Sequence, residues 1–149
     1  MQLSKIIKCV KVYINAKVKY GNQVKLPCKG ISGMHIAINS KSGHIKINEG
    51  ISTRRDVSLN VSDCGLIEIG DHVFINDGTK INARKSVHIG ENTIIGQNVL
   101  IYDHDHDYRS DNMASNFKSD DVVIGDNVWI GSGVIILKGT SISSRRLTE

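Results

Sequence analysis

The chain has 149 residues, of which 40% are hydrophobic but only 5% aromatic, and its formal charge is +4. That length suffices for one domain with a real core and not for two. No stretch is apolar enough for a membrane span, and the three cysteines lack the spacing of a zinc site. Lysines break up the first eight residues too often for a signal peptide, so we expect a cytoplasmic protein with reduced thiols.

The amino-terminal third is strongly basic. Residues 1–48 contain nine lysines and no acidic residue. Residues 3–10 match a short helical face, whereas residues 10–18 alternate like a strand. We therefore expect residues 1–44 to form a short helix or arm followed by irregular first coils. A basic segment can contact a membrane surface, although solvated strand faces are the plainer interpretation. It lacks the interleaved aromatic residues of a nucleic-acid-binding motif, so no nucleic-acid partner is expected.

A six-residue repeat occupies residues 45–142. Aliphatic residues return every sixth position within three blocks, and five of them precede glycine: Ile69, Ile89, Ile95, Ile124 and Ile130. A period of six fits neither an α-helix nor a long strand, but it fits a short strand followed by a turn, three times per coil. The sequence thus predicts one all-β domain over residues 1–149, a parallel β-helix with these inward-facing residues: Val73, Ile75, Ile89, Ile95, Ile101, Ile124 and Ile130.

The repeat is interrupted once, by a polar loop inserted near residues 102–121. The segment Tyr102-Asp103-His104-Asp105-His106-Asp107-Tyr108 opens this loop and carries a dense group of titratable side chains. Three interpretations compete: an imidazole that acts as a catalytic base, a metal site, and a polar surface loop without chemistry. The metal motif His-x-His-x-Asp-His fails here because Tyr108 stands where its last histidine belongs, and we expect no metal.

Three stretches resemble the hexapeptide-repeat acyltransferases, in particular the maltose, galactoside and capsule O-acetyltransferases. They are Ile-Gly-Asp-His-Val-Phe-Ile-Asn (69–76), Ile-Gly-Glu-Asn-Thr-Ile-Ile-Gly-Gln-Asn-Val-Leu-Ile (89–101) and Ile-Gly-Asp-Asn-Val-Trp-Ile-Gly-Ser (124–132). The resemblance implies a left-handed coil, a homotrimer with sites between subunits, and transfer of an acetyl group from acetyl-coenzyme A to a sugar hydroxyl. Capsule and lipopolysaccharide synthesis are the settings it suggests.

The resemblance also implies which histidine is catalytic. The family's histidine lies five residues after the last isoleucine of the coil, which is His106, and His104 is the second candidate. Asp107 stands where the family has proline, so the backbone around His106 can differ from the family's.

Four other positions match family residues that bind the acceptor or the coenzyme. Asn76 would hold the acceptor hydroxyl, although a plain turn asparagine is the simpler interpretation. Trp129 would line the pantetheine arm, although an exposed tryptophan can equally pack in a trimer. The backbone N–H of Ser132, next to Gly131, would stabilise the oxyanion.

The repeat stops at Ile142, where the family continues with further coils. We expect residues 143–149 to be a poorly ordered tail without repeats, typical of a truncation, and acetyl-coenzyme A to bind weakly or not at all. An inactive remnant or purely structural β-helix is therefore one alternative function. A γ-type carbonic anhydrase-like zinc enzyme is the other, although its typical His-x4-His pair does not occur in this sequence.

Overall fold

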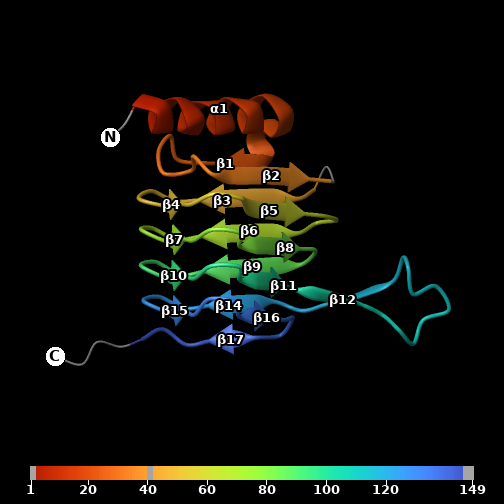
Figure 1. Cartoon of the computed structure of the whole chain (residues 1–149). Helices are drawn as coiled ribbons and strands as arrows, with labels where there is room; N and C mark the ends of the chain where they lie inside the picture. Colours follow the sequence, from red (N-terminus) through yellow and green to blue (C-terminus); the bar gives the residue numbers. More distant parts are fainter. Residues whose placement is uncertain (1–2, 40–41, 146–149) are drawn as a thin grey trace.

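Short parallel strands stack into three sheets that run along the molecule (Figure 1). This arrangement comes from a computed structural model, which describes residues 3–39 and 42–145. The strands form a solenoid of about five turns, consistent with a left-handed β-helix, and one helix precedes them. The predicted fold class is confirmed.

Each coil contributes one strand to each sheet in turn, and each sheet is defined by its strand order. The first sheet contains β1 (Val24–Lys25), β3 (His44–Ile47), β6 (Leu66–Ile69), β9 (Ser86–Ile89), β14 (Val122–Ile124) and β17 (Ser141–Ile142). The second contains β4 (Ser52–Thr53), β7 (Phe74–Ile75), β10 (Ile94–Ile95) and β15 (Trp129–Ile130). The third contains β2 (Met34–Ile38), β5 (Val57–Val61), β8 (Lys80–Ala83), β11 (Leu100–Tyr102) and β16 (Ile135–Ile136).

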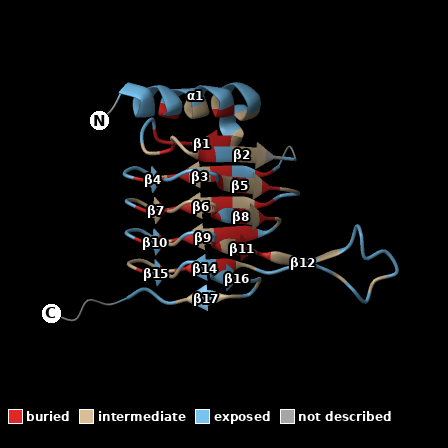
Figure 2. Cartoon of the chain, in the orientation of Figure 1, coloured by how far each residue is buried: buried red, intermediate tan, exposed pale blue. Residues whose placement is uncertain are grey.

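Buried residues recur along the strands of successive coils (Figure 2). Their aliphatic side chains form ladders inside the coil. All seven side chains predicted to face inward are at most 5% exposed, which confirms the six-residue register. Ile75, Ile95 and Ile130 pair directly across β7, β10 and β15, so one aliphatic residue stacks on the next. Burying such ladders provides the main stabilisation, about 25 cal/mol for each Å² of apolar surface removed from water.

The glycine that follows isoleucine is explained by close contact between coils. A Cβ added to Gly96 would lie 2.6 Å from Ser132 N, and one added to Gly125 would lie 2.4 Å from Ser144 N. Both distances are below any normal contact, so only glycine lets the next coil pack this closely. In such an Ile-Gly pair the isoleucine therefore belongs to the core, and the glycine allows the close spacing of the coils.

The amino-terminal helix is longer than the sequence predicted. Helix α1 spans Leu3–Tyr20 and leads through the short 3₁₀ helix η1 (Gly21–Gln23) into β1. The expected strand-like alternation over residues 10–18 is wrong. On a helix, residues four positions apart lie on the same side, so every second residue belongs to one of two separate rows. Here Val12 and Ala16 face the coils, whereas Val10, Ile14 and Val18 form the other row.

The last described residues continue the coil. Arg145 N donates to Asp126 O at 3.0 Å, and Asp126 N donates to Ser144 Oγ at 2.8 Å. The expectation of a poorly ordered tail is therefore wrong for Ser144 and Arg145, because both pair with Asp126 of the preceding coil. Residues 146–149 lie outside the described part of the chain.

Candidate active site

The inserted segment forms an antiparallel hairpin that projects from the β-helix (Figure 1). Its strands are β12 (His104–His106) and β13 (Phe117–Ser119), in a register that places His106 opposite Phe117. The hairpin, called the arm below, leaves the solenoid between β11 of the third sheet and β14 of the first sheet. The loop predicted near residues 102–121 is thus an ordered structure at one corner of the coil.

His104 sits at the root of the arm against a buried carboxylate. Its Nδ1 lies 2.7 Å from Oδ1 of Asp103, and the Asp103 side chain is fully buried. The same carboxylate accepts hydrogen bonds from the backbone N–H groups of Arg84 and Lys85, at 2.9 Å and 2.7 Å. Because a buried carboxylate needs such partners, this set of bonds fixes both the corner and the orientation of the His104 ring.

His106 lies farther out and is exposed. Its Nδ1 lies 2.9 Å from the backbone carbonyl of Met113, and its ring packs against Phe117 with centroids 4.4 Å apart. A carbonyl oxygen can only accept, so Nδ1 carries the proton in this contact when the ring is neutral. Nε2 then holds the free lone pair, which is the form that a general base needs.

Ion pairs hold the arm in place. Lys85 Nζ lies 3.0 Å from Asp120 and 2.8 Å from Asp121 at its base, and Lys118 Nζ lies 3.0 Å from Asp107 across the strands. The hydrogen bonds from Lys85 hold the pKa of both Asp120 and Asp121 below its usual value, and the bond from Lys118 does the same to the pKa of Asp107. The three carboxylates therefore stay ionised to a lower pH than they would without these lysines.

Asn76 lies at a different corner, directly after β7. Its Oδ1 accepts a hydrogen bond from the N–H of Asp77 at 2.8 Å, and its own N–H donates to Ile95 O at 3.0 Å. The first bond is the local contact of a turn asparagine. Its side-chain NH₂ group has no partner among the described residues, so it remains able to donate to an acceptor hydroxyl.

The predicted coenzyme-binding residues lie in β15 or directly after it, two coils on from β7. Trp129 is 78% exposed and pairs in register with Ile94, while Gly131 leads into the turn. Ser132 Oγ accepts a hydrogen bond from Gln97 N at 3.1 Å. The Ser132 N–H itself has no acceptor within the described residues, so it is an available donor for a developing oxyanion.

Within one chain the histidines of the arm do not meet the predicted acceptor-binding and coenzyme-binding residues. Asn76 and Ser132 lie where the second sheet turns into the third, whereas the arm leaves where the third sheet turns into the first. A coil with three sheets has three corners, so His106 and Asn76 occupy different ones.

Two residues of this region carry no role in the predictions from sequence. Asp103 is only one of several acidic residues in the loop sequence, although its position directly after a buried strand is a usable signal. Phe117 packs against His106 and lies under the Arg84 guanidinium, 3.5 Å from its centroid. Nothing in the sequence marks Phe117, because it follows a stretch without a period.

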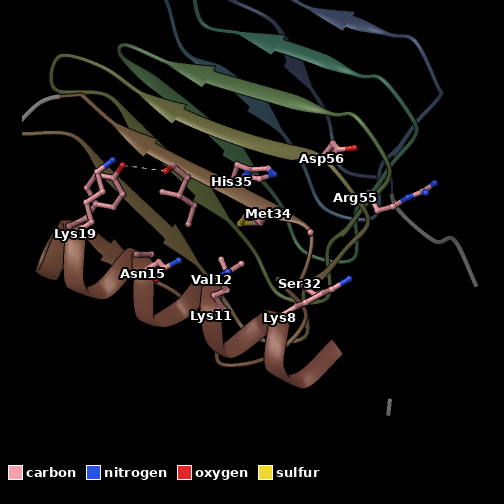
Figure 3. Close-up of a pocket in the computed structure, with 14 residues that line it drawn as sticks. Lys8, Lys11, Val12, Asn15, Lys19, Ser32, Met34, His35, Arg55 and Asp56 are labelled. Carbon is pink, nitrogen blue, oxygen red and sulfur yellow. Dashed lines mark hydrogen bonds between the residues drawn. The ribbon is translucent and has the colours of Figure 1, made fainter. Parts of the chain in front are cut away.

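Cavities occur elsewhere on the chain. One of about 470 Å³ lies between α1 and β2, and its lining includes Lys8, Lys11 and Lys19 (Figure 3). Neither His104 nor His106 lines it. Among residues 3–39 and 42–145, no group of three or more His, Cys, Asp or Glu side chains is arranged to hold a metal ion.

Similar proteins supply the chemical context. WbbJ of Escherichia coli (strain K12), named a putative lipopolysaccharide biosynthesis O-acetyl transferase, is 35% identical over 112 residues, which cover 68% of this chain and 57% of that protein. Nodulation protein L of Rhizobium meliloti is 42% identical over 76 residues, 50% of this chain and 42% of that protein. A putative acetyltransferase of Saccharomyces cerevisiae, YJL218W, is 39% identical over 77 residues, 51% and 39% of the two chains.

The chain therefore spans a little over half of one of these relatives and about two fifths of the other two. No protein-family model matches the chain, and no solved structure matches it significantly.

Proposed function

The chain is a hexapeptide-repeat β-helix similar to named acetyltransferases, and from that premise we propose that it is an O-acetyltransferase. The acetyl donor is acetyl-coenzyme A and the acceptor is a sugar hydroxyl, as in lipopolysaccharide or capsule synthesis. The observation that carries this proposal is the arm: it presents an exposed His106 whose Nδ1 contacts the Met113 carbonyl, which leaves Nε2 as the base.

The reaction uses few groups. His106 Nε2 takes the proton from the acceptor hydroxyl while the hydroxyl oxygen attacks the thioester carbonyl. The resulting oxyanion accepts a hydrogen bond from the free N–H of Ser132. When the intermediate collapses, the C–S bond breaks, the imidazolium returns its proton to the thiolate, and coenzyme A leaves as the thiol. The amide of Asn76 would hold the acceptor oxygen during the attack.

A homotrimer completes the site in this proposal. His106 and Ser132 lie at different corners of one chain, so the arm of one subunit would serve the corner of the next. Exposed apolar side chains on the last coils support such a contact, since a lone chain leaves them in water: Ile94, Val123, Trp129, Val134, Ile135 and Leu137. The exposed Trp129 would then face both the neighbour and the pantetheine arm.

We place this reaction in the cytoplasm. No helix of the described residues is long and apolar enough to span a membrane.

A direct assay tests the proposal. The purified chain is incubated with acetyl-coenzyme A and a panel of sugar and oligosaccharide acceptors, and released thiol and acetylated product are both measured. The sequence alone predicts weak binding of acetyl-coenzyme A, but Ser144 and Arg145 still pair with the preceding coil, so we expect transfer to at least one acceptor and its loss in His106→Ala. Circular dichroism checks that the variant is folded. A folded, trimeric wild-type chain that neither binds acetyl-coenzyme A nor transfers acetyl groups would contradict the proposal.

A further inference from the structure

We propose that α1 binds the surface of a membrane rich in anionic phospholipid, lying in the interface with one apolar face among the lipids. This inference concerns a surface far from the arm and does not depend on acetyl transfer. It arises from three features of α1: an exposed apolar stripe, a second face that already anchors the helix, and a set of lysines without acidic partners.

The stripe is a continuous row of aliphatic side chains in water. Its six members are Leu3 (72% exposed), Ile6 (38%), Ile7 (59%), Val10 (44%), Ile14 (51%) and Val18 (83%). Successive members of the row Leu3, Ile7, Val10, Ile14 and Val18 are three or four residues apart, so they lie along one side of the helix. Single exposed aliphatic residues are ordinary, but a contiguous stripe of them marks an interaction surface.

The fold does not need this stripe, because another face of α1 holds the helix to the coils. Cys9 and Ala16 are buried there, and Val12, Tyr13 and Tyr20 pack against the core. Two polar bonds reinforce the contact: Lys17 Nζ donates to Val24 O at 2.7 Å, and Tyr20 Oη donates to Ile36 O at 3.3 Å. The helix is thus firmly placed with its stripe outward.

The charge of α1 selects anionic lipid. The helix carries five lysines (Lys5, Lys8, Lys11, Lys17 and Lys19) and no acidic residue. Within the described residues none of the five makes an ion pair with a carboxylate, in contrast to Lys46, Lys85, Lys118 and Lys138 on the coils and arm. A helix with an apolar face and lysines beside it is typical of a segment that lies on a membrane.

The lysines next to the stripe also edge an open cavity. Lys8, Lys11 and Lys19 line the space between α1 and β2, together with Met34 of β2 (Figure 3). One carboxylate, Asp56, and one further cation, Arg55, line its opposite side. The positive charge therefore outweighs the negative charge on this flank, which suits the phosphates of lipid headgroups.

The position of α1 fits such a contact. The helix covers the amino-terminal end of the β-helix, and the arm projects from the coils near the other end (Figure 1). Binding a flat surface through α1 leaves the arm and β15 accessible. A second copy of the chain is a poorer occupant of the stripe, because pairing two such helices brings lysines against lysines.

Vesicle flotation tests the proposal. The full chain is mixed with vesicles of phosphatidylcholine alone or of phosphatidylcholine with phosphatidylglycerol. We expect binding only to the mixed vesicles, decreasing as salt rises. Ile7→Glu with Ile14→Glu should lower the bound fraction at least tenfold, and Lys8→Glu or Lys11→Glu by about fivefold each. Tyr108→Glu, at a 70% exposed position on the arm, is the matched control and should bind like the wild type.

Each other outcome counts against the proposal. Equal binding to both vesicle types would refute the role of the lysines, and binding to neither would refute membrane contact altogether. If the wild-type chain binds no vesicles and sedimentation shows an oligomer that Ile7→Glu with Ile14→Glu dissociates, a second copy covers the stripe. Circular dichroism of the double variant ensures that a lost signal is not due to unfolding.

Discussion

Asp103 and His104, adjacent in sequence, are joined by a 2.7 Å contact between a fully buried carboxylate and a largely buried imidazole. Two backbone N–H groups, of Arg84 and Lys85, donate to the same carboxylate. This arrangement orients His104 as a carboxylate orients the histidine of a catalytic triad. Yet the pair is enclosed at the root of the arm, whereas His106, two residues on, is exposed. We therefore assign anchoring to His104 and proton transfer to His106.

The first prediction follows from the buried carboxylate. Asp103→Asn replaces an oxygen that accepts a backbone N–H by an NH₂ group that cannot accept. The remaining oxygen can still accept from Arg84 N and Lys85 N, but loss of the negative charge weakens both bonds, which costs about 1–3 kcal/mol of stability. Thermal unfolding measures the loss. Asp105→Asn is the control, because Asp105 is exposed and pairs with Lys138 on the surface, so it should leave the melting temperature nearly unchanged. Equal losses in both variants would contradict the anchoring role of Asp103.

The second prediction separates the two histidines. His106→Ala removes the proposed base and should lower kcat about a hundredfold or more, with little change in melting temperature. His104→Ala should lower kcat less and the melting temperature more, because it uncovers the Asp103 carboxylate. Acetyl-transfer kinetics and thermal unfolding of both variants are the measurements. A larger loss of kcat at His104 would make His104 the base.

Much of this fold could be predicted because the aliphatic residues that recur every six positions are the residues of the core. The six-residue phase predicts seven of the inward ladder residues between Val73 and Ile130, and the break in that phase locates the arm. The amino-terminal helix was harder. This helix has two apolar faces, one with Val10, Ile14 and Val18 and the other with Val12 and Ala16. In the sequence the residues of the two faces alternate with polar residues, which is the pattern of a strand.

The relative placement of the site residues could not be predicted from one chain's repeat. The six-residue repeat predicts that Asn76 and Ser132 lie at the same corner of the coil. The direction in which a hairpin leaves the coil, however, depends on bonds between residues far apart in sequence. Lys85 reaches Asp120 and Asp121 across 35 and 36 positions of sequence, and no local pattern marks those partners. The same holds for Phe117, which meets His106 only because the two strands pair.

The third prediction concerns the pH dependence of the arm. Lys85 holds the pKa of Asp120 and of Asp121 below its usual value, and Lys118 does so for Asp107. A lowered pKa in the folded state means that the ion pair stabilises the arm above the ordinary carboxyl pKa and that this stability is lost as pH falls through the folded pKa. In Lys85→Met, the pKa of Asp120 and Asp121 should rise toward the ordinary value.

Carboxyl carbon NMR during a pH titration measures all three groups in one experiment. Asp107 serves as the internal control, because its partner Lys118 is unchanged and its pKa should stay low. If the pKa values of Asp120 and Asp121 are the same in Lys85→Met as in the wild type, Lys85 is not the group that holds the base of the arm.

The fourth prediction compares two equivalent glycines in successive coils. A Cβ on Gly96 would lie 2.6 Å from Ser132 N and 2.8 Å from the carbonyl carbon of Gly131, so Gly96→Ala must push the next coil away. We expect a loss of about 1–3 kcal/mol in stability, the usual cost of overpacking, and a shifted Ser132 N–H that weakens oxyanion stabilisation.

On Gly131 the nearest atom to an added Cβ is Val134 Cγ2 at 4.0 Å, so Gly131→Ala should fold as stably as the wild type. Chemical denaturation gives the stabilities. Equal stability of the two variants would mean that coil spacing, and with it the position of the Ser132 amide, does not depend on the glycine after isoleucine.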